Sequence, residues 1–187
     1  MSIENEEIAL LTEEYGGEWG INHTKRLLKI ISDIGVGFQY NNKVVTISAY
    51  LHDWGGYAKW IKPDMDHAIR SKQVAEEFLR AKECGKDLMD HVLECIEYHH
   101  SATDNNSIEA ILLSDADALD FLGVVGVLRD FSKKPNDLRK AYETVKVRRD
   151  KLPQRIILPK ALEIAEKRVI LMDELLKEFE QETYGQF

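Results

Sequence analysis

The chain of 187 residues contains little of what marks several specialised protein classes. It has only two cysteines, Cys84 and Cys95, in no CxxC motif, which excludes a disulfide framework or a cysteine-ligated zinc module. We expect both to be small buried thiols in a reducing compartment. The longest strongly apolar runs without charge, residues 44–51 and 121–128, have eight residues each, whereas a membrane span needs about 20. We therefore predict no membrane association. The acidic N-terminus also lacks the basic region of a secretory signal.

Positive charge is scarce as well. The chain has 25 Lys and Arg against 33 Asp and Glu, a net charge of −8, which argues against a protein that holds long nucleic acid. Its 44% hydrophobic and 31% charged residues are typical of a globular cytoplasmic protein. Residues 129–155 are the exception, with ten basic and four acidic residues. Such a segment is commonly a solvated helix face, and the alternative is that some of these residues face a small anionic substrate.

Hydrophobic residues recur at helical rather than alternating spacing along most of the chain. This periodicity predicts helices over residues 23–34, 68–82, 87–100, 108–122, 138–150 and 160–184, the last of them long and amphipathic. Residues 44–54 are apolar enough for a strand, but they also suit a buried helix that ends before Gly55 and Gly56. Strand signals are weak elsewhere, so the expected fold is all-α.

The histidines are the most informative residues. Five of the six form an ordered pattern with two aspartates: His23, His52-Asp53, His67, His99-His100 and Asp117. Each lies in or beside a segment that the periodicity places at the core, where an imidazole or carboxylate without a partner is costly or shifts its pKa. A metal ion is the simplest partner for all of them. The sixth histidine, His91, lies outside the pattern, and we expect it to be an ordinary core or surface residue.

This order of residues resembles the HD-domain superfamily of metal-dependent phosphohydrolases. The matching motifs are H-T-K-R-L (23–27), A-Y-L-H-D-W-G (49–55) and D-A-D-A-L-D (115–120). The last motif places the metal aspartate at Asp117 rather than Asp115, while His67, His99 and His100 resemble the extra ligands of dinuclear members. The resemblance implies a single HD-domain helical bundle over residues 1–187. Its motif core lies at about 20–125, and a basic helical segment and the C-terminal helix pack on that core.

The resemblance also implies a ligand set for one or two ions. One ion would be held by His23, His52, Asp53 and Asp117, and a second by His67, His99 and His100, with Asp53 bridging. Imidazole-rich sets favour Mn, Fe, Co, Ni or Zn over Mg. Two divalent ions would leave the site at +2, which favours a phosphate, whereas one ion would leave it neutral. Adjacent histidines on a regular helix point about 100° apart, so His99 and His100 can share an ion only if their helix ends or distorts there.

The activity implied by the resemblance is hydrolysis of a small phosphate ester, in particular a nucleotide, with Asp53 at the catalytic centre. Arg26 lies one turn after His23 on the same face and is the first choice for a phosphate contact, although it also suits a surface position. Lys59, Lys62 and Asp120 are open alternatives for proton transfer, and Lys59 and Asp120 also for substrate contact. Other interpretations are an HD-fold di-iron oxygenase and a non-catalytic metal-binding regulatory protein. A homodimer is left open.

Overall fold

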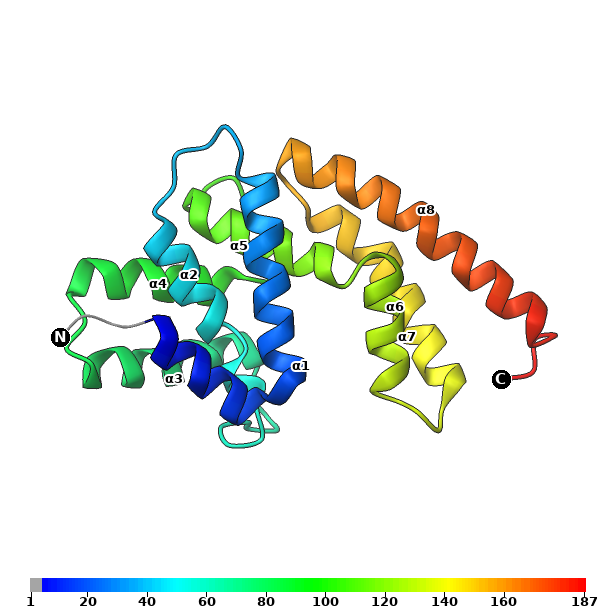
Figure 1. Cartoon of the computed structure of the whole chain (residues 1–187), viewed down its shortest axis with the longest axis horizontal. Coiled ribbons are helices and arrows are strands. Elements are labelled where there is room, and N and C mark those ends of the chain that lie inside the picture. The colour runs from blue at the N-terminus through cyan, green and yellow to red at the C-terminus, as the bar shows by residue number, and fades with distance from the viewer. Residues whose placement is uncertain (1–4) are drawn as a thin grey trace. The chain divides into compact units, whose positions relative to one another are not determined.

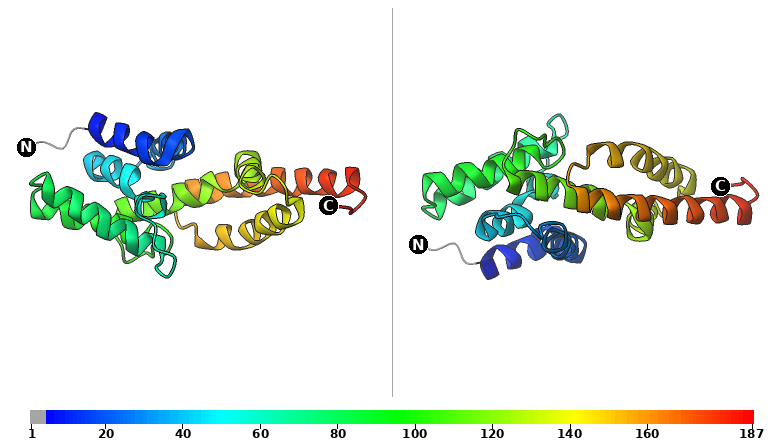
Figure 2. Two further views of the ribbon diagram at one scale, coloured as in Figure 1. Left: turned by 90° about the horizontal axis from the view of Figure 1, so that it is seen from below. Right: turned by 90° about the horizontal axis from the view of Figure 1, so that it is seen from above.

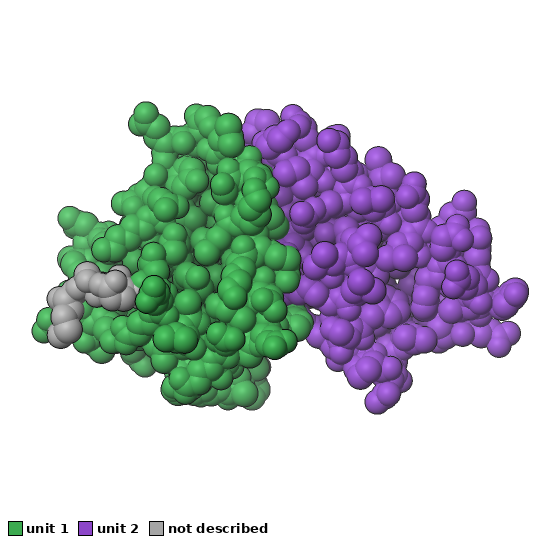
Figure 3. All heavy atoms as spheres, in the orientation of Figure 1, with its two compact units in different colours: residues 1–116 green, residues 117–187 purple. Residues whose placement is uncertain are grey.

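The computed structural model describes residues 5–187, which are helical with connecting turns and contain no strand (Figure 1). This confirms the all-α prediction. The chain divides into two compact units, residues 1–116 and 117–187, coloured separately in Figure 3 and described in turn below. The expectation of a single domain over residues 1–187 stays a prediction. Within residues 5–187, no helix combines the length and the apolar character needed to cross a membrane.

Unit 1 is built from helices that pack mainly in pairs. Helix α2 packs against both α1 and α4, while α3 packs against α4 and a short 3₁₀ helix, η1 (Figures 1 and 2). Their bounds are α1 (Asn5–Ile34), α2 (Asn42–Leu51), η1 (Trp54–Gly56), α3 (His67–Ala81), α4 (Lys86–Tyr98) and the first part of α5 (Ile108–Asp120). The core is formed by fully or almost fully buried aliphatic side chains, among them Leu27, Ile34, Ile47, Leu51, Leu79, Val92, Ile96 and Leu112.

Helix α1 is longer than the predicted helix over residues 23–34 and contains a kink. Gly17 has φ 62° and ψ −169°, so two helical segments meet there at a residue outside the helical region. A positive φ is readily adopted only by glycine. The second segment carries His23, which the kink leaves on a regular stretch of helix.

The segment that suited either a strand or a buried helix is a helix. The side chain of Asn41 caps α2 by accepting hydrogen bonds from the backbone N–H groups of Lys43 and Val44. The helix is apolar on several faces because it packs between α1 and α4. It ends without a left-handed residue, since His52 is still helical and Asp53 has φ −102°.

The sequence suggested that Gly55 helps to terminate α2, but its role in the structure is different. Its φ is not in the left-handed region, and a Cβ at this position would lie 2.3 Å from the backbone nitrogen of Ser71 in α3. The backbone N–H of Gly55 donates a hydrogen bond to Ser71 Oγ at 2.9 Å. The absence of a side chain at Gly55 lets the turn after Asp53 lie directly against α3.

The prediction for α4 differs from the structure at one end. The helix ends at Tyr98, two residues before the predicted end, and His99 is its C-cap. Cys95 is buried in this helix, as expected, and burial raises the pKa of its thiol to about 12. Cys84 is only half-buried, in the turn between α3 and α4.

Unit 2 contains the remainder of α5 and three further helices. The long α8 runs beside α6 and α7 (Figure 2). The elements are α6 (Gly123–Ser132), α7 (Leu138–Lys151), a 3₁₀ helix η2 (Leu152–Arg155) and α8 (Pro159–Glu182). The predicted helices over 138–150 and 160–184 are confirmed to within two residues at each end. The sequence periodicity did not predict α6. Helix α5 ends at Asp120, two residues before the end of the predicted helix over 108–122.

Candidate metal centre

Six of the predicted ligands come together in unit 1. They form two groups of three, His23, His52 and Asp53 in one and His67, His99 and His100 in the other. Within each group the ligand atoms all lie within 4.8 Å of one another. Four segments supply them: α1, the end of α2, the start of α3 and the end of α4. The fold thus gathers residues from four parts of the sequence at one place.

The carboxylate of Asp53 lies between the two groups. Its Oδ2 is 3.5 Å from Nε2 of His52 and 3.7 Å from Nε2 of His23. Its Oδ1 is 3.7 Å from Nε2 of His67, in the other group. One carboxylate therefore presents one oxygen to each group, which is the arrangement that the prediction of a bridging Asp53 requires.

Backbone carbonyls fix the rings of two histidines. Nδ1 of His52 donates a hydrogen bond to the carbonyl of Ala49 at 2.8 Å, and Nδ1 of His99 donates to the carbonyl of Ile96 at 2.6 Å. A carbonyl oxygen can only accept, so Nδ1 carries the proton in both rings. In the neutral ring Nε2 then holds a lone pair, which is the form that ligates a metal. Both Nε2 atoms are buried.

The end of α4 brings His99 and His100 together. Because the helix stops at Tyr98, the two adjacent rings lie with centroids 3.8 Å apart instead of diverging around a helix. Nε2 of His100 is 2.6 Å from Nε2 of His67, at the first residue of α3. The helix end that the sequence analysis gave as the condition for these two histidines to converge is present in the structure.

Burial differs across the centre. His23, His52 and His99 are at most 1% exposed, whereas the side chain of Asp53 is 20% exposed and that of His67 is 40% exposed. The centre is thus deeply buried around His52 and accessible around His67. Five imidazoles and one carboxylate with this disposition fit divalent transition metals, which bind imidazole readily and benefit from backbone hydrogen bonds to the second ring nitrogen.

Two aromatic residues beside the centre lie outside the sequence prediction. The ring of Tyr57 occupies the space where Gly16 and Gly20 of α1 lack side chains, and burial together with the charge of Asp53 raises its pKa. Trp19 lies one turn before His23, with ring centroids 6.1 Å apart. The helical spacing of Trp19 from His23 is visible in the sequence, whereas the contact of Tyr57 with α1 depends on tertiary packing.

The remaining predicted site residues occupy varied environments. Arg26 is half-buried on α1, and Lys59 is exposed with its ammonium 3.5 Å from the centroid of the Tyr15 ring. Asp117 and Asp120 are buried in the part of α5 that belongs to unit 2, and Asp120 forms an ion pair with Arg129. The roles of these four residues stay predictions.

His91 behaves as expected for a residue outside the centre. Its Nε2 is 3.1 Å from Oε2 of Glu109, and the other oxygen of that carboxylate, Oε1, accepts a hydrogen bond from the backbone N–H of Asn41. His91 is therefore engaged in a structural pair and belongs to neither of the two groups of metal-ligand candidates.

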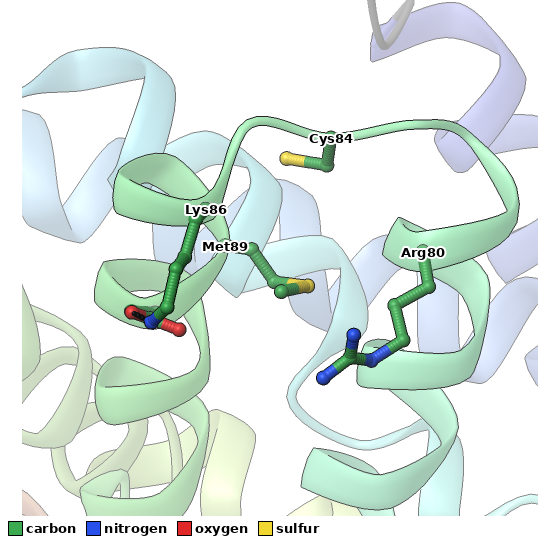
Figure 4. Close-up of a pocket in the computed structure, with 5 residues that line it drawn as sticks. Arg80, Cys84, Lys86 and Met89 are labelled. Atoms are coloured by element: carbon green, nitrogen blue, oxygen red, sulfur yellow. Dashed lines mark hydrogen bonds and ion pairs between the residues drawn. The ribbon is translucent and has the colours of Figure 1, made fainter.

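A separate hollow of about 340 Å³ lies at the other ends of α3 and α4 (Figure 4). The thirteen residues of α4 place it about 20 Å from the histidines. Cys84 and Met89 project into it, but its charges are engaged along the helices, Arg80 with Glu76 and Lys86 with Asp90. Burial raises the pKa of the Cys84 thiol, so this hollow presents no activated nucleophile.

Comparison with known proteins identifies the sequence pattern. The HD domain family matches residues 20–122 of this chain, a span that contains all the predicted metal ligands. No curated protein matches the chain.

Solved structures share the fold over nearly the whole chain. A predicted HD superfamily hydrolase from an uncultured Thermotogales bacterium is 24% identical, with a TM-score of 0.67 over 95% of this chain and 91% of that one. An HD-superfamily hydrolase from Bacillus thuringiensis is 20% identical, with a TM-score of 0.72 over 97% of each chain. YpgQ from Bacillus subtilis, solved in complex with ADP, is 23% identical, with a TM-score of 0.72 over 95% of this chain and 94% of that one.

Proposed function

The chain belongs to the HD-domain family, and on that basis we propose that it is a metal-dependent phosphohydrolase acting on a small phosphate ester, in particular a nucleotide. The observation that carries the proposal is the position of Asp53. Its two carboxylate oxygens face two separate groups of imidazoles, each able to hold one ion. Phosphoryl transfer is the chemistry that benefits most from two adjacent cations, because negative charge develops on several oxygens at once.

The residues that would hold the metal divide naturally between two ions. The first ion would be held by His23, His52 and Asp53, with Asp117 as a further proposed ligand. The second ion would be held by His67, His99 and His100, and Asp53 would contact both ions. Nitrogen-rich ligation of this kind suits Mn, Fe, Co, Ni or Zn. When bound, such ions polarise a phosphoryl oxygen and lower the pKa of a coordinated water to about 7.

The protein's own contribution is to hold these groups rigidly. The carbonyls of Ala49 and Ile96 fix the orientation of His52 and His99, so the ligands need no rearrangement to present their lone pairs. Burial of three of the histidines keeps bulk water from one side of the centre. The exposed edges of His67 and Asp53 are where a substrate would approach.

Three further residues are proposed to contact the substrate. Arg26, three residues after His23 on α1, would bind a phosphate oxygen through its guanidinium. Lys59 and Asp120 would contact the substrate or transfer a proton to the leaving group. A nucleotide is favoured as the substrate class because YpgQ, which shares the fold, was solved in complex with ADP.

Metal analysis followed by a phosphate-release assay tests the proposal. The purified chain is analysed for bound metal and then incubated with nucleoside mono-, di- and triphosphates under argon, in Mn²⁺, Co²⁺, Ni²⁺ or Mg²⁺. We expect release of phosphate or pyrophosphate with at least one transition metal, its loss in His52→Ala and its retention in His91→Ala. Substrate-dependent oxygen consumption in air would instead support an oxygenase, and full metal content without turnover would support a regulatory protein.

A further inference from the structure

The side chain of Tyr57 lies in a notch on α1. Tyr57 directly follows η1, four residues after Asp53, and its ring lies over Gly16 and Gly20 of α1. A Cβ at Gly16 would lie 2.8 Å from the hydroxyl oxygen of Tyr57, and a Cβ at Gly20 would lie 2.7 Å from it. The two glycines therefore make room for the end of this side chain, where its only polar atom is.

This notch lies beside the candidate metal centre. Gly20 is three residues before His23 on the second segment of α1, so the two positions lie on one face of the helix. Burial and the negative charge of Asp53 raise the pKa of the Tyr57 hydroxyl, which means that the carboxylate and the hydroxyl are close enough to interact. His23 and Asp53 belong to the same group of candidate ligands. The hydroxyl is therefore a neighbour of the group that would hold the first ion.

The hydroxyl of Tyr57 has no hydrogen-bond partner in the chain itself. Tyr57 is half-buried, and within residues 5–187 its phenolic oxygen forms no hydrogen bond. A tyrosine hydroxyl that is removed from water usually has a partner, because its desolvation is otherwise not compensated. Phenylalanine would fill the same notch without this cost. The hydroxyl is thus a hydrogen-bonding group that is placed beside the centre and is available to a bound ligand.

We propose that the hydroxyl of Tyr57 donates a hydrogen bond to a phosphate oxygen of the ligand bound at the candidate metal centre. A phenol carries its proton at neutral pH, and its hydrogen bond to an anionic oxygen is stronger than one between neutral groups. A neutral donor also suits a site that would hold divalent cations, because these cations would repel a lysine or arginine. The inference rests on the proposed function in taking the ligand to be a phosphate compound, and it adds a substrate-binding residue to that function.

Direct binding to the whole chain tests this proposal without reference to hydrolysis. The protein is loaded with Mn²⁺ and freed of excess metal, its metal content is measured, and it is titrated by calorimetry with inorganic phosphate and with ADP. We expect saturable binding of both compounds by the wild type. Tyr57→Phe should weaken the binding of both by at least about tenfold, because it removes one hydrogen bond to an anionic oxygen.

Tyr40→Phe is the matched control, because it removes the same hydroxyl from a second tyrosine that packs on a glycine. The ring of Tyr40 lies against Gly35, directly after α1, where a Cβ would be 2.8 Å from Cε1 of the ring. Gly35 is twelve residues after His23, which corresponds to about 18 Å along a helix. Tyr40→Phe should therefore bind phosphate and ADP with the wild-type affinity.

Metal content and thermal unfolding separate a contact with the ligand from a role in packing. Tyr57→Phe keeps the ring over both glycines, so its bound Mn²⁺ and its melting temperature should equal those of the wild type. The proposal is overturned if the wild type binds neither compound saturably, or if Tyr57→Phe binds both with the wild-type affinity. It is equally overturned if the weaker binding in Tyr57→Phe is accompanied by loss of bound Mn²⁺. The expected difference in a chain that releases no phosphate would refute the proposed function and leave this inference standing.

Discussion

Nε2 of His67, the first residue of α3, lies 3.7 Å from Oδ1 of Asp53, the residue that follows α2 and its cap. The other oxygen of the same carboxylate faces His23 and His52. In the described part of the chain, Asp53 belongs to the group of His23 and His52 and also faces His67 of the other group. Replacement of Asp53 should therefore reduce metal binding by both groups, whereas replacement of His67 should reduce it in one group only.

The first prediction follows from this shared position. Asp53→Asn keeps the size of the side chain but removes its charge, so we expect the bound metal to fall from near two ions per chain to well below one. His67→Ala should retain one ion, because the group around His23 is left intact. Inductively coupled plasma mass spectrometry after dialysis measures both, with His91→Ala as the control that keeps the wild-type content. Equal metal content in Asp53→Asn and wild type would show that the carboxylate does not bridge.

The second prediction concerns the protonation of the ligands. In the metal-free protein, His52 and His99 should each carry a proton on Nδ1, because each donates a hydrogen bond to a backbone carbonyl. Long-range ¹H–¹⁵N spectra distinguish the two ring nitrogens, and His52→Ala and His99→Ala assign the signals. An Nδ1 without a proton in either ring would contradict the proposed preorganisation.

The third prediction uses two adjacent glycines. A Cβ at Gly55 would meet the backbone of α3 at 2.3 Å, whereas nothing lies within 4 Å of a Cβ at Gly56. Gly55→Ala should therefore destabilise the protein by about 1–3 kcal/mol through overpacking and displace His67 from Asp53. Gly56→Ala should leave the stability close to the wild-type value. Urea denaturation measures the difference, and metal analysis should show a loss only in Gly55→Ala. Similar stabilities for the two variants would mean that the close approach to α3 is unimportant.

The comparison of sequence and structure shows where local patterns suffice. The helix over residues 138–150 was predicted from the sequence and forms nearly as predicted, with Asp137 as its N-cap. Helix α6 was not predicted, and two glycines in its ten residues, Gly123 and Gly126, lower its helix propensity.

The candidate site was likewise predictable from the sequence only in part. The order of its histidines and aspartates directed attention to His52 and Asp53, and helical geometry gave the condition, a helix end, under which His99 and His100 come together. The position of Tyr57 against α1 was not predictable, because it depends on Gly16 and Gly20, about forty positions earlier in the sequence. The role of Gly55 likewise depends on the distant backbone of Ser71 and not on its own φ angle.

The fourth prediction concerns the two thiols. Burial raises the pKa of Cys95 to about 12 and also raises that of Cys84, so both hold less thiolate at pH 8 than a free thiol with its ordinary value of 9.0. Cys84 is half-buried and should react slowly with Ellman's reagent, faster as the pH rises, while Cys95 should react only on unfolding. Cys84→Ser and Cys95→Ala separate the two reactions. Rapid modification of folded Cys84→Ser would show that Cys95 is accessible.

The central claim is that two groups of ligands sharing Asp53 form a phosphohydrolase centre, and a metal titration of activity tests it most directly. The metal-free chain is titrated with Mn²⁺ under argon while phosphate release from the nucleotide selected in the substrate panel and bound ions per chain are measured together. We predict that the rate stays low until the first ion is bound, then rises to its maximum as the content approaches two, and that Asp53→Asn stays at background throughout. A rate that is independent of Mn²⁺, or a wild-type rate in Asp53→Asn at saturating Mn²⁺, would contradict the claim.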